Sequence, residues 1–122
     1  VLDELRLRRP DIVSAAAKLI TGNAFELNTI AHKHERAIET SERLYHILDA
    51  GVCFDDPGVL TEVAYWEWDS FTPEGLMPEQ LHVCATHFAQ ATRATMSTSS
   101  HAVLEPFFAE MVSALHVDSD AA

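Results

Sequence analysis

Hydrophobic residues along this chain recur at steps of three and four residues, which is typical of amphipathic helices. No alternation of apolar and polar residues at period two lasts for more than a few positions, so the sequence does not favour strands. The pattern predicts an all-α fold. In chain order, the predicted helices cover about residues 11–20, 24–50, 57–71, 78–96 and 103–115.

Residues that start and stop helices support these boundaries. Pro10 precedes the first predicted helix, and Gly22 follows it. Gly51 is expected to end the longest helix in a left-handed conformation. Asp55 and Asp56 are expected to cap the next helix. The inward positions predicted from the spacing are Leu27, Ile30, Ala37, Leu44, Leu48, Val59, Leu60, Val63, Ala64, Leu81, Cys84, Ala85, Phe88, Ala91, Val103, Leu104, Phe107, Phe108, Met111, Val112 and Leu115.

The length of 122 residues fits one domain, which we assign to residues 1–117, with a frayed tail at 118–122. The net charge of −11 is uneven, since residues 1–43 are neutral and residues 44–122 contain Arg93 as their one Lys or Arg against twelve acids. Such a surface repels phosphate, so nucleic acid is not an expected partner. No stretch approaches the length of a membrane span, so we expect no membrane insertion. The two distant cysteines, with no second pair, favour a reducing cytoplasm as the location.

Metal and catalytic chemistry find little support in the sequence. Cys53 and Cys84 stand far apart, which argues against a zinc site or a disulfide framework. His82 and Cys84 would point about 200° apart on a helix, so they cannot chelate one ion together. A metal site is therefore not expected. The sequence contains no HExxH motif, no glycine-rich phosphate loop and no recognisable triad, so we expect a protein that is not an enzyme.

Four acidic and imidazole side chains recur along the longest predicted helix at steps of four, three and four residues. They are Glu35, Glu39, Glu42 and His46. Di-iron bundles use Glu-x-x-His motifs on facing helices, and this spacing does not provide one. We interpret the face as acidic and solvated.

Several segments resemble the phycobiliproteins of the allophycocyanin type. The heptapeptide RRPDIVS at residues 8–14 is similar to the family's RRPD-V-V-S segment, and GNAF at 22–25 is similar to its G-N-A-Y. LYHILDAGVCFDD at 44–56 resembles the end of the family's long helix, and FFAEMVSAL at 107–115 resembles its terminal segment. The resemblance covers about residues 8–116 and implies a globin-like helical domain. The family's N-terminal hairpin and first two globin helices are expected to be missing before Val1.

The chain departs from the family at the residue that binds the chromophore. Phycobiliproteins attach a bilin to the cysteine of a C-x-R-D motif on the long helix. Alignment on Gly51 puts Ala37, Glu39 and Thr40 at the cysteine, arginine and aspartate, and alignment on residues 22–23 puts Lys33 at the cysteine. Neither alignment supplies a thiol, so no cofactor is expected to be bound covalently.

The resemblance then implies a binding or carrier module linked to bilin metabolism, which holds a linear tetrapyrrole without a covalent bond. The residues expected to line its pocket are Arg36, Glu39, Tyr45, His46 and Trp66. Arg36 would pair with a propionate, and Glu39 would accept hydrogen bonds from pyrrole N–H groups.

Two alternatives stay open. One is a structural or assembly protein of a phycobilisome-like complex. The other is a haem-binding globin, although the helix after Asp56 contains no histidine, which leaves His34 or His46 to approach an iron. Because the missing helices would leave faces of the remaining ones uncovered, we expect a homo-oligomer or pairing with a related globin-like subunit.

Overall fold

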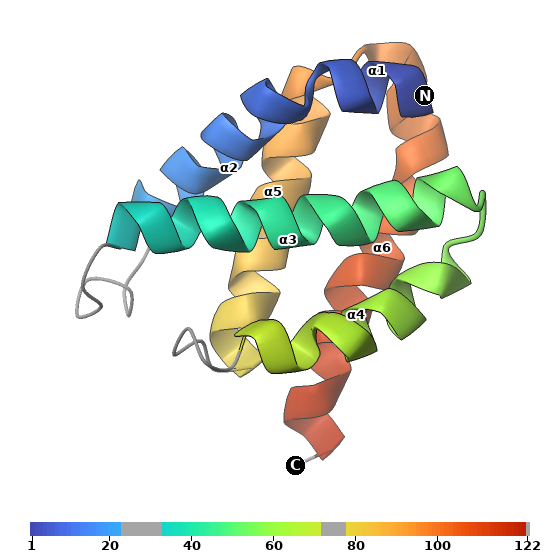
Figure 1. Ribbon diagram of the computed structural model, residues 1–122. Helices are drawn as coiled ribbons and strands as arrows, with labels where there is room; N and C mark the ends of the chain where they lie inside the picture. Colours follow the sequence, from blue (N-terminus) through green and yellow to red (C-terminus); the bar gives the residue numbers. More distant parts are fainter. Residues whose placement is uncertain (23–32, 72–77, 122) are drawn as a thin grey trace.

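A computed structural model describes the backbone of residues 1–22, 33–71 and 78–121, together with most of the side chains in these ranges. These residues are helical and contain no strand, which confirms the all-α prediction. The helices are α1 (Leu2–Leu7), α2 (Arg9–Gly22), α3 (Lys33–Cys53), α4 (Gly58–Phe71), α5 (Pro78–Thr95) and α6 (Thr98–Ala121) (Figure 1). Within the described residues, no helix is both long enough and apolar enough to cross a membrane.

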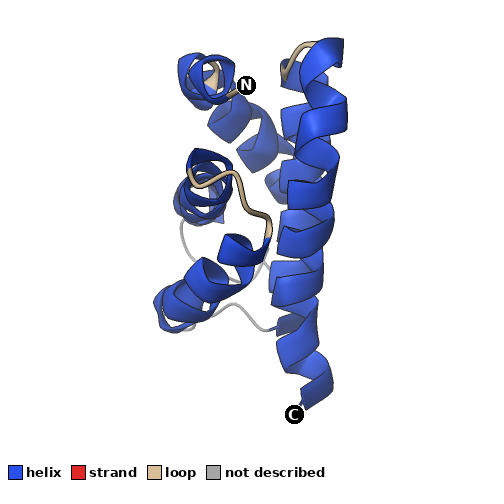
Figure 2. Ribbon diagram, turned by 90° about the vertical axis from the view of Figure 1, so that its right-hand side faces the viewer, coloured by secondary structure: helices blue, strands red, loops and turns tan. Residues whose placement is uncertain are grey.

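The helices form two crossed layers, which are seen edge-on in Figure 2. The first four helices make up one layer, and α5 and α6 pack side by side in the other. α2 packs on α5 and α4 packs on α6, while α3 contacts both helices of the second layer. The long helix α3 is therefore the element that spans the molecule.

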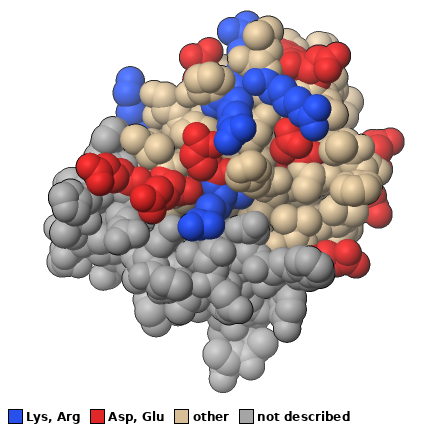
Figure 3. All heavy atoms as spheres, viewed as in Figure 1, with Lys and Arg blue, Asp and Glu red and all other residues tan. Residues whose placement is uncertain are grey.

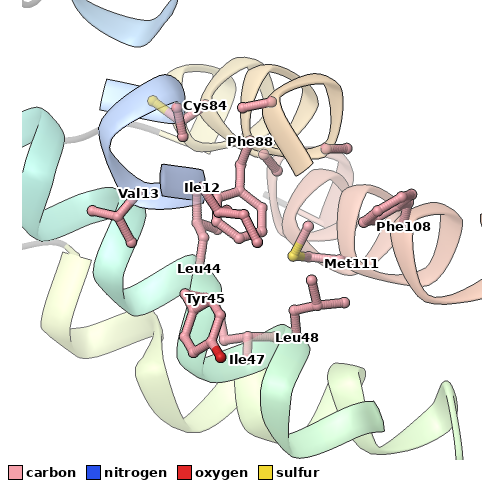
Figure 4. Close-up of a cluster of buried hydrophobic side chains, with 14 of the residues drawn as sticks. Ile12, Val13, Leu44, Tyr45, Ile47, Leu48, Cys84, Phe88, Phe108 and Met111 are labelled. Carbon is pink, nitrogen blue, oxygen red and sulfur yellow. The ribbon is translucent and has the colours of Figure 1, made fainter. Parts of the chain in front are cut away.

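The hydrophobic core lies between the two layers and receives side chains from every helix (Figure 4). Most of the inward positions that the sequence predicts and the structure describes are buried, whereas Val59, Val63 and Val112 are only partly buried. Leu27, Ile30 and the side chains of Leu81 and Leu115 lie outside the described residues. Val103 is 45% exposed, so its predicted place in the core is wrong. α6 buries positions 100, 104, 107, 108 and 111, and Val103 lies about 100° around the helix from Leu104.

The N-terminal part begins with a helix that the pattern did not predict. α1 has only six residues, too few for a periodic signal and too few to be stable alone. α2 begins at Arg9 and ends at Gly22, close to the predicted bounds of 11–20. The beginning of the longest predicted helix, residues 24–32, lies outside the described residues, and α3 is described from Lys33.

The role predicted for Gly51 is wrong. α3 continues through Gly51 to Cys53, and the residue with a left-handed backbone is Asp55, with φ of 52°. A Cβ atom at Gly51 would lie 2.7 Å from Leu60 Cδ2 and 3.2 Å from Phe107 Cδ1. Glycine is needed here because α4 and α6 approach α3 closely, and not because the helix ends.

Of the two aspartates expected to cap the next helix, Asp56 makes the cap, and the neighbouring boundaries are confirmed. Asp56 Oδ1 accepts a hydrogen bond of 2.9 Å from the backbone N–H of Gly58, the first residue of α4. α4 ends at Phe71, and α5 begins at Pro78.

The turn between α5 and α6 is shorter than the polar break predicted at 95–100. It contains only residues 96–97, because α6 begins at Thr98. The imidazole Nε2 of His101 donates to the carbonyl oxygen of Arg93 at 2.6 Å and so caps the end of α5. At its other end α6 is helical as far as Ala121, into the stretch assigned as a tail.

Candidate functional site

A groove about 270 Å³ in volume lies between α2 and α3, the two helices that carry most of the resemblance. Its lining is Pro10, Val13, Ser14, Ala17, Lys18, Ile38 and Glu42. The floor is aliphatic, whereas Lys18 and Glu42 place opposite charges on its edges. Three of these residues belong to the heptapeptide 8–14, so the motif and the long helix share one surface. We name it the α2/α3 groove.

An arginine bridges the two helices beside this groove. The Arg9 guanidinium donates to Glu42 Oε2 from Nη2 at 2.7 Å and from Nε at 3.2 Å. Its carbon Cζ lies 5.0 Å from the centre of the Tyr45 ring, a cation–π contact. Glu42 is therefore already neutralised by Arg9, which leaves Lys18 as the cation on the groove's edge.

Tyr45, one of the predicted pocket residues, lies in the core and is only 2% exposed. Its hydroxyl donates to Asp49 Oδ2 at 3.3 Å, and Asp49 also accepts two hydrogen bonds from Arg6, at 3.1 and 3.2 Å. Burial, together with the charge of Asp49, raises the pKa of Tyr45 to about 12, so the phenol stays protonated. In this structure Tyr45 joins α3 to the two arginines, and it does not line the groove.

Glu39 and His46 are both exposed on α3, and neither lines the α2/α3 groove. The His46 ring meets its neighbour Tyr45 edge to face, with 6.5 Å between the ring centres. The structure thus brings His46 together with Tyr45 but not with the groove. The side chains of Arg36 and Trp66, the other two predicted pocket residues, lie outside the described part of the chain.

A second groove, about 500 Å³ in volume, lies between α5 and α6. Its lining is His82, Thr86, Ala89, Arg93, Glu105, Phe108, Ala109, Val112 and Ser113. Arg93 closes one side, since its guanidinium makes hydrogen bonds of 2.6 and 2.9 Å to Glu105 and stacks 4.8 Å from the Phe108 ring centre. Arg93 lowers the pKa of Glu105 through these hydrogen bonds. We name it the α5/α6 groove.

Sequence reasoning missed both grooves. Small residues at Ala17, Ala89 and Ala109 on the groove walls are the one local signal that the helices approach closely there. The hydrophobic pattern does not predict which helices pack against each other, and the walls of each groove come from two different helices.

The described residues contain no group of three or more His, Cys, Asp or Glu side chains placed to hold a metal ion. Cys53 and Cys84 are both free thiols. Cys84 is buried, and this burial raises its pKa to about 12, whereas His82 on the same helix lies on the α5/α6 groove. The two side chains diverge, as their spacing predicts.

Basic side chains on the face shown in Figure 3 gather over α1 and α2, with acidic side chains among them. Arg6, Arg8 and Arg9 each pair with a carboxylate, of Asp49, Asp11 and Glu42 respectively. Arg6 and Arg9 therefore pair with residues of α3, whereas Arg8 pairs with a residue three positions further along the chain.

Comparison with known proteins gives no match: no family model, no curated protein and no solved structure is significantly similar to this chain.

Proposed function

We propose that this chain is a non-enzymatic binding or carrier module, related to the phycobiliproteins and sharing their globin-like fold, that holds a linear tetrapyrrole without a covalent bond. One observation carries the proposal. The heptapeptide on which the resemblance rests contributes Pro10, Val13 and Ser14 to an apolar groove whose other wall is the long helix. In the family that this sequence resembles, the bilin belongs to the long helix.

The groove offers the two kinds of contact that a bilin needs. Pro10 and Ile38 offer aliphatic surface to flat pyrrole rings above the buried Val13 and Ala17, and the Lys18 ammonium can pair with a propionate. Pockets that enclose a drug-sized ligand have volumes of about 300–1,000 Å³. A groove of 270 Å³ therefore leaves part of a tetrapyrrole in water, which suits reversible transfer better than permanent storage.

Alignment on Gly51 puts Ala37 at the family's cysteine, and its placement supports a non-covalent mode, whereas the side chain of Lys33, the alternative, lies outside the described residues. Ala37 is completely buried, so this position faces the core and not the groove. A ligand on the groove would meet Ile38, the next residue, instead.

Absorbance spectroscopy tests the proposal. The protein is titrated with biliverdin or phycocyanobilin, and in parallel with haemin, and each complex is then denatured in acidic urea. We expect a sharpened, red-shifted bilin band that returns to the spectrum of free bilin on denaturation. Unchanged spectra with every tetrapyrrole would refute a carrier role.

Two matched variants locate the ligand. Ser14 lines the α2/α3 groove, Ser113 lines the α5/α6 groove, and both are exposed, so each can become glutamate without entering the core. Ser14→Glu places a negative charge beside the propionates and is expected to raise the dissociation constant about tenfold, equivalent to about 1.4 kcal/mol. Ser113→Glu should leave it unchanged. A raised dissociation constant in Ser113→Glu and an unchanged one in Ser14→Glu would mean that the ligand binds in the α5/α6 groove.

A structural or assembly protein is the second candidate, and it is favoured by two exposed apolar side chains. Leu7 is 76% exposed, and Phe54 is 71% exposed. If they belong to an interface with a related globin-like subunit, Leu7→Ser and Phe54→Ser weaken that association while the fold is kept. Unchanged association in both variants would count against this role.

A further inference from the structure

The turn between α3 and α4 presents an aromatic side chain to solvent. Phe54 is 71% exposed, and Asp55 and Asp56 beside it are also exposed. The backbone there is fixed, because the Phe54 N–H donates to the Ala50 carbonyl oxygen at 3.1 Å and Asp56 caps α4. Aromatic side chains are enriched in protein–protein interfaces. We name Phe54, Asp55 and Asp56 the α3–α4 knob.

The α2/α3 groove has the chemistry that complements this knob. Pro10 and Ile38 provide aliphatic surface, and Lys18 stands exposed on the edge. Lys18 makes no hydrogen bond or ion pair with the described residues, so its charge is available to a partner. The α5/α6 groove differs, because its Arg93 is already bonded to Glu105. An apolar side chain flanked by carboxylates therefore fits the α2/α3 groove better.

The knob cannot fill the groove of its own chain. Both are attached to α3, and at a rise of about 1.5 Å per residue Phe54 lies about 18 Å along the helix axis from Glu42 in the groove wall. The α3–α4 turn stands at the right-hand edge of the molecule in Figure 1, beyond the end of α3. Only a second molecule can bring the two surfaces together.

We propose that the α3–α4 knob of one copy of this chain docks in the α2/α3 groove of a second copy. The Phe54 ring packs on the aliphatic surface of the groove, and Asp55 and Asp56 face Lys18. Pockets that enclose a drug-sized ligand have volumes of about 300–1,000 Å³. The groove, at about 270 Å³, is smaller and suits one aromatic side chain.

The distribution of charge favours this surface over the rest of the molecule. The net charge of −11 falls on residues 44–122, whereas residues 1–43 are neutral. An acidic knob is therefore repelled by most of the chain and least by α2. Because the knob and the groove are different surfaces, a pair of copies keeps one knob and one groove free, and association continues beyond a dimer.

Mixing two variants, each lacking one half of the interface, tests the proposal. Sedimentation velocity of the full chain is measured up to millimolar concentration, without a tetrapyrrole. Phe54→Ser removes the aromatic side chain of the knob, and Ser14→Glu blocks the groove by placing a carboxylate one helical turn from Lys18. We expect the wild type to sediment faster as its concentration rises and each variant to stay monomeric. An equal mixture should form a dimer, because the groove of the first variant accepts the knob of the second.

Two control variants should associate like the wild type. Ser113→Glu places the same charge on the α5/α6 groove, and Phe54→Leu keeps an apolar side chain on the knob. A wild type that is monomeric at every concentration, association that persists in Phe54→Ser, or a mixture without dimer would overturn the proposal. Loss of association in Ser113→Glu would overturn it as well. None of these results involves a tetrapyrrole, so the carrier role is tested separately.

Discussion

The carboxylate of Glu4 in α1 accepts a hydrogen bond of 2.6 Å from the hydroxyl of Ser100 in α6, across 96 residues of sequence. The same carboxylate receives the N–H and the hydroxyl of Ser97, so it caps the beginning of α6 from a different helix. Glu4, in a helix of six residues, thus caps the N-terminal end of α6, the longest helix in the described chain.

This cap makes the stability of the fold depend on pH. The hydrogen bonds from Ser100 and Ser97 lower the pKa of Glu4 from 4.5 to about 2. Because the folded pKa is depressed, the stabilisation is complete above about pH 4.5 and is lost as the pH falls through about 2. Urea unfolding between pH 5 and 2 should show a smaller decline for Glu4→Gln than for the wild type. Parallel declines for the two proteins would contradict the assignment.

Adding a single methyl group at Gly51 should lower the free energy of unfolding. In Gly51→Ala the new Cβ would overlap Leu60, and overpacking of this kind costs about 1–3 kcal/mol of the free energy of unfolding. Thermal or urea unfolding measures this loss. Gly22→Ala is the control, because a Cβ there meets no atom within 4 Å. We expect it to be neutral or to stabilise by up to about 1 kcal/mol. Equal effects at the two glycines would mean that the helices do not approach as described.

Replacing Ser41 with alanine should stabilise the fold. Its side chain is completely buried in α3, and its hydroxyl has no hydrogen-bond partner among the described residues. Ser41→Ala removes this uncompensated polar group and should raise the free energy of unfolding by about 1 kcal/mol. Thr92→Val makes the contrast, since the buried Thr92 hydroxyl donates to the Phe88 carbonyl at 2.8 Å. That variant should lose about 1 kcal/mol. Destabilisation by Ser41→Ala would show that the hydroxyl is satisfied in solution.

The two thiols should differ in reactivity. Cys53 is exposed, whereas Cys84 is buried and its pKa is raised to about 12 by that burial. The thiolate is the reactive form, so a thiol reagent at pH 8 should modify Cys53 alone in the folded protein and both cysteines after unfolding. Mass spectrometry of the labelled peptides identifies the site. Rapid labelling of Cys84 in the native state would argue against the packing of α5 on α2.

Much of the helical framework follows from the sequence. The stripe containing Leu44 and Leu48 marks the inward face of α3, and Asp56 and Pro78 mark the starts of α4 and α5. These signals are local, since each depends on residues within a turn or two of one another. The candidate site could be predicted from the sequence to a lesser extent. Tyr45 and His46 share a helix with the α2/α3 groove, yet the groove itself depends on Lys18 and Ile38, which come from different helices.

The sequence by itself determined the helical class of the chain, several helix boundaries and most of the inward side of α3, α5 and α6. Only the tertiary structure decided that Gly51 is a packing residue, that Glu4 caps α6 and that Arg9 bonds to Glu42 on another helix. The physical reason is distance along the chain. Helix periodicity and capping are written within a few neighbouring residues, whereas these contacts join segments that meet only after the layers have packed.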